Sequence, residues 1–265
     1  MSQSADPVLL DVTAEGIAIV TLNRPEKRNA FDELMIAGLS DTFETLKGAD
    51  KVRIVFLRGE GESFCAGADI DWMRRAAEFS ELGNETDALA LARMLRHLHE
   101  LPQLTVALAH GAAMGGGAGL VAACDIAVAV KDTKFRFSEV RLGLTPATIS
   151  PYVIEAIGPR HAKALFATAE SFDGAYAEKI GLTQYTVDDA GGLRKIMEHL
   201  SELTLAAAPG AVSDAKALVR YVAGHKIDDG LAKETARRIA ARRVSAEGRE
   251  GLAAFLEKRK PEWNS

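Results

Sequence analysis

Two glycine-bearing turns, 64–70 (FCAGADI) and 114–120 (MGGGAGL), form the pattern in this sequence that most clearly indicates a chemical role. Each follows an apolar run typical of a strand and opens a segment typical of a helix. A strand–turn–helix junction leaves backbone N–H groups without partners at the start of the helix. Two such junctions on neighbouring strands can direct two N–H donors at one oxygen atom, as in an oxyanion hole. The small side chains there also let a bulky planar group approach the backbone.

Glu139 is the candidate acid/base because it directly follows an alternating, half-exposed strand pattern at 134–138. One carboxylate beside a polarised carbonyl compound can move a proton or activate a water molecule. An alternative interpretation makes Glu139 a surface carboxylate paired with Arg136 or Arg141. Each glycine turn, taken singly, favours the structural interpretation, which is close packing of a helix on a sheet. The two turns together with Glu139 favour a functional site.

The elements that must position these residues follow a β-α-β rhythm. We expect strands at 17–23, 52–59, 105–109, 126–130 and 134–138, and helices at 29–47, from about 70, and at 85–100. This rhythm predicts parallel strands joined by right-handed crossovers. From about residue 151 the strand signals fade and helical patterns dominate, with charged amphipathic helices at 235–243 and 249–260.

Composition is typical of a globular protein of one large or two small domains, with 265 residues, 48% hydrophobic and 26% charged. The net charge of −5 argues against a nucleic-acid-binding protein. Cys65 and Cys124 lie in apolar runs, so we expect two buried, reduced thiols and a reducing, cytoplasmic location. The six histidines show no spacing typical of metal ligands, which predicts that the protein binds no metal.

Two further patterns in the sequence are misleading. The apolar span 104–130 is long enough to raise the question of a membrane helix, but it contains five glycines, His110 and Asp125, so we expect no membrane span. The segment 117–122 matches the GxGxxA dinucleotide fingerprint, and Glu139 lies about 20 residues further on, where a ribose-binding acid is expected. A complete strand at 126–130 intervenes, however, so we expect no nicotinamide cofactor.

A series of motifs, taken in order, resembles the crotonase (enoyl-CoA hydratase/isomerase) superfamily over nearly the whole chain. The motifs are 23–30 (NRPEKRNA), 64–70, 115–117, 124–126, 137–143 (FSEVRLG) and 250–260 (EGLAAFLEKRK). The resemblance implies an α/β fold in which a crotonase-like spiral of repeated β-β-α units spans 1–205 and holds the active site. It implies a C-terminal helical region at 206–265 that serves assembly into a homo-trimer or dimer of trimers. It also implies acyl-CoA thioester substrates, with coenzyme A as part of the substrate and no metal or redox cofactor.

The same resemblance assigns roles to individual positions. The N–H groups of Ala68 and Gly116 correspond to the oxyanion hole, and Glu139 corresponds to the general acid/base. The residues assigned to the coenzyme A end of the substrate are Lys27 and Arg28 along the nucleotide, Ala66 at the adenine, Phe255 and Lys258 at the adenine and phosphate, and Asp69, Ile70 and Gly115 in the turns.

One position departs from the hydratases that use two glutamates, because Gly119 stands where they carry the second glutamate. A Δ3–Δ2 isomerisation needs only one base, which keeps an isomerase that uses Glu139 alone as an alternative. The segments 138–152 and 67–73, however, resemble hydratases of branched glutaconyl-CoA esters, a subgroup similar in lacking that glutamate. We therefore expect an enoyl-CoA hydratase. A non-catalytic scaffold that binds coenzyme A is the second alternative.

Overall fold

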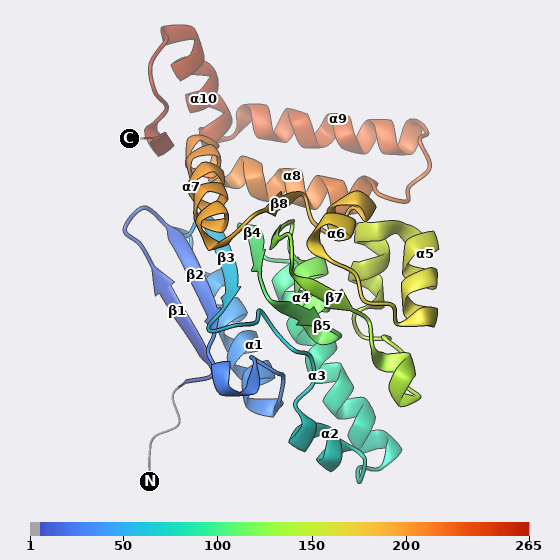
Figure 1. Ribbon diagram of the computed structural model, residues 1–265. Coiled ribbons are helices and arrows are strands. Elements are labelled where there is room, and N and C mark those ends of the chain that lie inside the picture. The colour runs from blue at the N-terminus through green and yellow to red at the C-terminus, as the bar shows by residue number, and fades with distance from the viewer. Residues whose placement is uncertain (1–5, 265) are drawn as a thin grey trace.

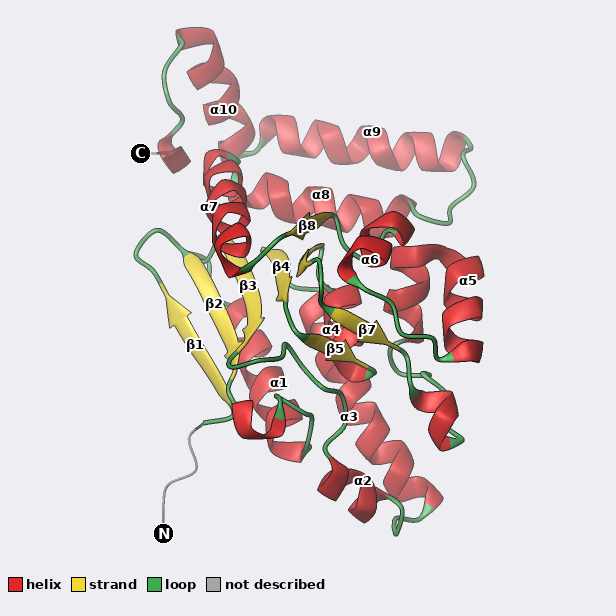
Figure 2. Ribbon diagram, viewed as in Figure 1, coloured by secondary structure: helices red, strands yellow, loops and turns green. Residues whose placement is uncertain are grey.

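A six-stranded sheet forms the centre of the chain in the computed structural model, which describes residues 6–264 (Figures 1 and 2). Its order is β1-β2-β3-β4-β6-β8, and only the β1–β2 pair is antiparallel. The strands are β1 (Val8–Val12), β2 (Ile17–Leu22), β3 (Ile54–Gly59), β4 (Leu104–Ala109), β6 (Ile126–Val130) and β8 (Tyr185–Val187). Parallel neighbours such as β3 and β4 bring their carboxyl ends, and the turns that follow them, to one edge of the sheet.

A second, smaller layer of extended segments lies beside this sheet. It contains β5 (Ala112–Met114) paired in parallel with β7 (Lys134–Arg136), and it is extended by the single bridges Phe31–Ala68, Cys65–Ala113 and Phe135–Phe172. Each strand β3, β4 and β6 is therefore followed by a short segment of the second layer and then by helix. This repeat is the β-β-α spiral that the resemblance implies.

Helices cover both faces of the main sheet. Those that precede the C-terminal region are α1 (Glu33–Lys47), α2 (Ile70–Ala76), α3 (Glu81–His99), α4 (Gly116–Ala123), α5 (Ser150–Thr168), α6 (Gly174–Ile180) and α7 (Ala190–Ala206), with 3₁₀ turns η1 (Pro25–Lys27) and η2 (Glu139–Leu142). Alternation along β3 divides the core, since Val55 and Leu57 pack toward α1, α3 and α4 while Ile54 and Phe56 pack toward α7. Buried apolar side chains on both faces hold the sheet rigidly under the turns that follow its strands.

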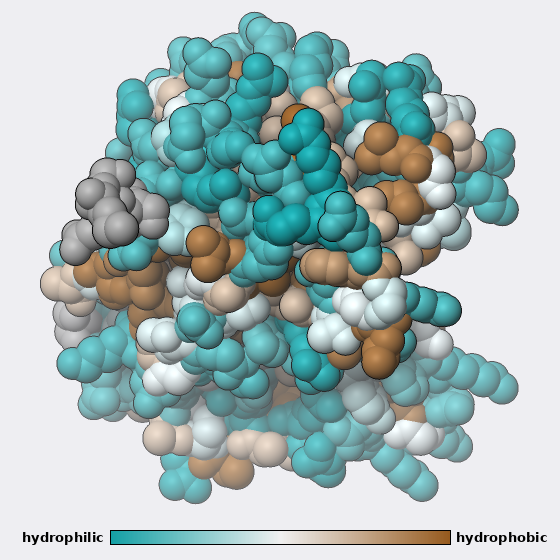
Figure 3. Space-filling model, turned by 90° about the horizontal axis from the view of Figure 1, so that it is seen from below, coloured by the Kyte–Doolittle hydropathy of each residue, from teal (hydrophilic) through white to brown (hydrophobic). Residues whose placement is uncertain are grey.

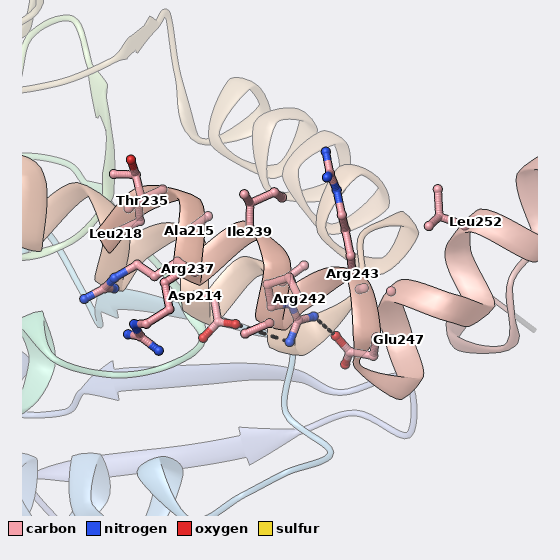
Figure 4. A pocket seen from close by; sticks show the side chains of 15 residues that line it. Asp214, Ala215, Leu218, Thr235, Arg237, Ile239, Arg242, Arg243, Glu247 and Leu252 are labelled. Atoms are coloured by element: carbon pink, nitrogen blue, oxygen red, sulfur yellow. Dashed lines mark hydrogen bonds and ion pairs between the residues drawn. The ribbon is translucent and has the colours of Figure 1, made fainter. Parts of the chain in front are cut away.

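The C-terminal helices α8 (Pro209–Val222), α9 (Asp229–Val244) and α10 (Ala246–Glu257), followed by η3 (Glu262–Asn264), lie at the end of the molecule opposite α2 (Figure 1). Lys216 of α8 anchors this region to the core: its ammonium donates to the carbonyls of Leu101 and Gln103 and pairs with Asp125. Arg242 joins the three helices by pairing with Asp214 at 3.2 Å and with Glu247 (Figure 4).

The structure confirms every element that the periodicity predicts, with ends displaced by a few residues. It adds β1, β5 and β8, which the pattern analysis missed because they are short or near the surface. None of the helices in residues 6–264 is both long and apolar enough to cross a membrane. The division at 205/206 stays a prediction; a loop at 207–208 separates α7 from α8 there.

Candidate active site

The first glycine turn is fixed by hydrogen bonds that leave the N–H of Ala68 without a partner in the described chain. The N–H of Phe31 donates to Gly67 O at 2.7 Å, and the N–H of Asp69 donates to Phe31 O at 2.7 Å. These two bonds form the bridge around Ala68, whose own N–H donates to no partner among residues 6–264. Gly67 adopts φ +93°, a backbone conformation that favours glycine. The turn therefore presents a backbone donor at an exposed position.

The second glycine turn packs directly on the first. A Cβ at Gly67 would lie 3.0 Å from Met114 O, and a Cβ at Gly117 would lie 2.6 Å from Cys65 O. The N–H of Gly115 donates to Arg136 O at 2.9 Å, and Gly115 has φ +47°. In the described part of the chain, the N–H of Gly116 at the start of α4 donates to no partner. The structure thus brings both turns together, and Ala68 and Gly116 each offer an unused N–H donor there.

Glu139 opens η2 and directs its carboxyl group at the second turn. Its Oε1 lies 3.2 Å from the position that a Cβ on Gly115 would take. Its Oε2 is buried and has no hydrogen-bond partner within residues 6–264. Burial raises the pKa of this carboxyl above its ordinary value, and a backbone hydrogen bond opposes the shift without cancelling it. The alternative of a surface pair with Arg136 or Arg141 is wrong, because Glu139 forms neither ion pair in the described chain.

Three of the residues assigned to coenzyme A lie beside the first turn. Arg28 and Lys27 are exposed on the loop that precedes α1, and Arg28 O accepts a 2.9 Å hydrogen bond from the N–H of Ala66. Lys27 Nζ lies 3.2 Å from Asp71 Oδ2 in an exposed ion pair. This loop is rigid because the buried Asn29 side chain donates to two carbonyl oxygens, those of Glu60 and Ser63, at 2.8 Å.

Asp69, Ile70 and Gly115 take different positions around the turns. Asp69 is only 5% exposed, and its carboxylate accepts from the N–H groups of Asp71 and Trp72 at the start of α2. Its hydrogen-bonding capacity is thus used by the protein itself. Ile70 is exposed at the first position of α2, and Gly115 lies beneath the Glu139 carboxyl.

Phe255 and Lys258 do not meet the other predicted residues within one chain. Both lie at the end of α10, at the opposite end of the molecule from α2 (Figure 1). The Phe255 side chain is 81% exposed, and Lys258 ends the helix in the left-handed conformation with φ +56°. These two residues can join the Glu139 site only if they belong to another copy of the chain.

The surface around the site combines polar and apolar side chains. Figure 3 views the end of the molecule that carries α2 and shows a largely hydrophilic face with separate hydrophobic patches. Exposed apolar side chains in segments that flank the site are Ile70, Val140, Leu142 and Leu144. Two hollows lie elsewhere, one of about 760 Å³ between α8, α9 and α10 (Figure 4) and one of about 840 Å³ between α1 and α3.

The remaining chemistry-bearing groups take no part in the site. Cys65 and Cys124 are free thiols; Cys65 is buried as predicted, whereas Cys124 is half-buried. Desolvation raises the pKa of both, that of Cys65 to about 12, so neither forms a reactive thiolate near neutral pH. No group of three or more His, Cys, Asp or Glu side chains within residues 6–264 could hold a metal ion.

One residue beside the site has no counterpart in the sequence predictions. Ile149, the residue that precedes α5, is 1% exposed and lies against Gly119 of α4. The glycine at 119 signals that some group packs closely there, but periodicity cannot identify a residue 30 positions away.

Comparisons with known proteins identify the family of this chain. The family model described as enoyl-CoA hydratase/isomerase matches residues 12–265. A mitochondrial methylglutaconyl-CoA hydratase from Mus musculus is 32% identical over 263 residues, covering 96% of this chain and 81% of its own length. The crystal structure of an enoyl-CoA hydratase from Shewanella pealeana has 38% identity and a TM-score of 0.94, covering 97% of this chain and 96% of its own. Pseudomonas aeruginosa AtuE has 37% identity and a TM-score of 0.93, covering 98% and 100%.

Proposed function

The chain belongs to the enoyl-CoA hydratase/isomerase family, and we propose that it adds water to the double bond of a 2-enoyl-CoA thioester. The observation that carries this proposal is the position of the Glu139 carboxyl beside Gly115. The next residue in the turn, Gly116, has an N–H that donates to no partner in the described chain. The names of the relatives support hydration, and the mouse relative suggests a branched or glutaconyl-type acyl group for this chain.

The two glycine turns provide the electrostatic part of the proposed mechanism. The thioester carbonyl oxygen accepts hydrogen bonds from the N–H groups of Ala68 and Gly116, which have no partners in the described chain. As the carbonyl becomes an enolate, negative charge grows on that oxygen, and two fixed donors stabilise it more strongly than they stabilise the neutral ester. The removal of one such donor typically slows turnover roughly 10²–10³-fold.

Glu139 provides the proton transfers. As a carboxylate it takes one proton from water while the water oxygen forms a bond to Cβ, and the electrons of the double bond move onto the thioester as an enolate. The protonated Glu139 then gives that proton to Cα, the enolate collapses to the thioester, and the carboxylate is restored. A raised pKa suits this double role, because the acid form is then easier to reach near neutral pH. These steps need no metal or redox cofactor, and coenzyme A enters as part of the substrate.

A second candidate reaction, Δ3–Δ2 isomerisation, is favoured by one observation. Gly119 stands where hydratases that use two glutamates carry the second one, and Ile149 lies against Gly119. With a single carboxylate, Glu139 can remove a proton from Cα of a 3-enoyl-CoA and return it to Cγ, which moves the double bond without water.

Recognition of coenzyme A extends the proposal to the assembly. Lys27 and Arg28 offer positive charge to the nucleotide beside Ala66, and Phe255 and Lys258 of a neighbouring copy complete the adenine and phosphate end. The apolar side chains of Leu252, Phe255 and Leu256 on α10 are 56%, 81% and 78% exposed, which is a face that another subunit could cover. We therefore infer a homo-trimer or dimer of trimers, and the two reduced thiols support a cytoplasmic location.

A panel of thioesters tests the proposal. Linear 2-enoyl-CoAs, 3-methylglutaconyl-CoA and 3-enoyl-CoAs are incubated with the wild type and with Glu139→Gln, and both hydration and isomerisation are followed. Hydration of at least one 2-enoyl-CoA that depends on Glu139 supports the hydratase. Isomerisation without hydration would assign the second reaction. Stoichiometric binding of coenzyme A thioesters without any turnover would leave the non-catalytic scaffold.

A further inference from the structure

Two glycines lie about one helical turn apart at the start of α4: Gly115 is its N-cap and Gly119 is in its first turn. They are joined by the first hydrogen bond of the helix, from the N–H of Gly119 to Gly115 O at 3.0 Å. The missing side chain of Gly115 makes room for the Glu139 carboxyl, and the missing side chain of Gly119 makes room for Ile149. Glu139 thus contacts the N-cap of α4 and Ile149 contacts its first turn, about 6 Å apart along the helix axis.

The space at Gly119 is filled completely. A Cβ built there would lie 2.3 Å from Ile149 Cγ2 and 3.0 Å from Ile149 Cβ, distances at which one group must move. Ile149 has little freedom to move, because it is 1% exposed and its carbonyl accepts a 3.1 Å hydrogen bond from the N–H of Val153 in α5. Gly119 is itself a buried residue of α4, and α5 packs against that helix.

We propose that Ile149 determines the reaction specificity of this site, by occupying the place that a carboxylate at position 119 would need. The inference deepens the proposed function and rests on it. With Ile149 in place, an apolar group stands one helical turn from the Gly115 contact of Glu139. Glu139 is then left to act on water or on a substrate C–H bond without a second carboxylate from position 119. The pair Gly119 and Ile149 therefore sets the ratio of hydration to isomerisation, and position 119 cannot gain a side chain while Ile149 stays in place.

Packing is tested first, by a double-mutant cycle that does not depend on activity. Gly119→Ala should lower the melting temperature, since even a methyl group meets Ile149 Cγ2. Ile149→Ala removes that atom and should restore part of the loss in the double variant. Ile149→Val retains the branched atoms and is the matched control, which should restore none of it. A Gly119→Ala variant that melts like the wild type would overturn the proposal.

Specificity is tested with Gly119→Glu/Ile149→Ala, compared with Gly119→Gln/Ile149→Ala, which has the same size and no carboxylate. We expect the glutamate variant to show at least a severalfold higher ratio of hydration to isomerisation than the glutamine variant, with equal binding of a non-reactive acyl-CoA. If the wild type is active and the glutamate variant folds but shows an unchanged ratio, the specificity role of Ile149 is overturned and the proposed function stands. A wild type inactive in both reactions overturns the proposed function and, with it, the specificity role.

Discussion

Arg24 and Asp69 form an ion pair across the first glycine turn, with Nη2 3.3 Å from Oδ2. The same guanidinium pairs with Asp32 at 2.7 Å and donates to Ala30 O at 3.0 Å. Asp32 and Asp69 are the N-cap residues of α1 and α2, so one arginine ties together the starts of two helices. Ala68, which directly precedes Asp69, is held in place by this cluster. We therefore expect Asp69 to act as a positioning residue, whereas the family resemblance assigned it to the coenzyme A end of the substrate.

The Asp69→Asn variant should unfold more easily at neutral pH. Burial raises the pKa of the Asp69 carboxyl, but the N–H groups of Asp71 and Trp72 and the charges of Lys27 and Arg24 outweigh burial and hold it below its ordinary value. A lowered pKa stabilises the fold above the ordinary value of 3.8, and this contribution is lost as the pH falls through the folded-state pKa. We expect a loss of about 1 kcal/mol at pH 7 that shrinks in acid, measured by urea unfolding. Exposed Asp71→Asn serves as the control, and equal stability of wild type and Asp69→Asn at pH 7 would contradict the role.

The Glu139→Gln variant should lose turnover and keep binding. The substituted glutamine retains the shape of the side chain but cannot take or give a proton, so kcat should fall roughly 10²–10⁴-fold. The affinity for a non-reactive acyl-CoA, measured by calorimetry, should change little, because the proposed donors to the thioester are backbone N–H groups. Full activity of the variant on the best substrate of the panel would show that another acid performs the chemistry.

The same variant should also change how stability depends on pH. The folded-state pKa of Glu139 is raised, so its contribution to stability is fully present below the ordinary value of 4.5 and is lost as the pH rises through the folded-state pKa. Glu139→Gln removes this penalty of ionising a buried carboxyl. The variant should therefore melt higher than the wild type at pH 8, and this advantage should disappear near pH 4. A wild type that melts higher at pH 8 would mean that the carboxylate is stabilised in the folded protein.

The Lys27–Asp71 ion pair should compete with coenzyme A. Lys27 is proposed to meet the nucleotide, yet Asp71 lies 3.2 Å away and also pairs with Arg74 at 3.1 Å. Exposed pairs contribute about 0.2–1 kcal/mol, so Asp71→Asn should tighten acyl-CoA binding a few fold, and Lys27→Ala should weaken it. Both effects should diminish as salt rises, because ions screen exposed charges. Titrations with acyl-CoA at low and high ionic strength measure these affinities. An affinity that changes with neither substitution nor salt would place the nucleotide elsewhere.

The strands, helices and glycine turns could be predicted because local chemistry dictates them, whereas the spiral arrangement and the roles of the site residues followed from the family resemblance. Glycines at 67 and 115 adopt positive φ, and the strand periodicities fix where the turns begin. The close approach of Ile149 to Gly119 could not be predicted, because it depends on how α5 packs on α4. The use of Asp69 as a cap could have been recognised, since an aspartate directly before a helical pattern is an N-cap signal. Phe255 is separated from the site by the tertiary arrangement of the helices, which the sequence pattern does not predict.

Mixed oligomers should reveal whether α10 of one subunit serves the site of another. A chain with Glu139→Gln has no acid/base but an intact α10, and a chain with Phe255→Ala and Lys258→Ala has the reverse. If Phe255 and Lys258 act on a neighbour, co-expressed chains form some sites with an intact Glu139 and an intact neighbouring α10. At substrate concentrations below KM, activity should then exceed that of the two pure variants averaged in the same proportion. Light scattering must show that both variants assemble as the wild type does, since a stable wild-type monomer at micromolar concentration contradicts the assembly itself. Activity equal to the average, with assembly intact, would mean that α10 stabilises the oligomer without reaching the substrate.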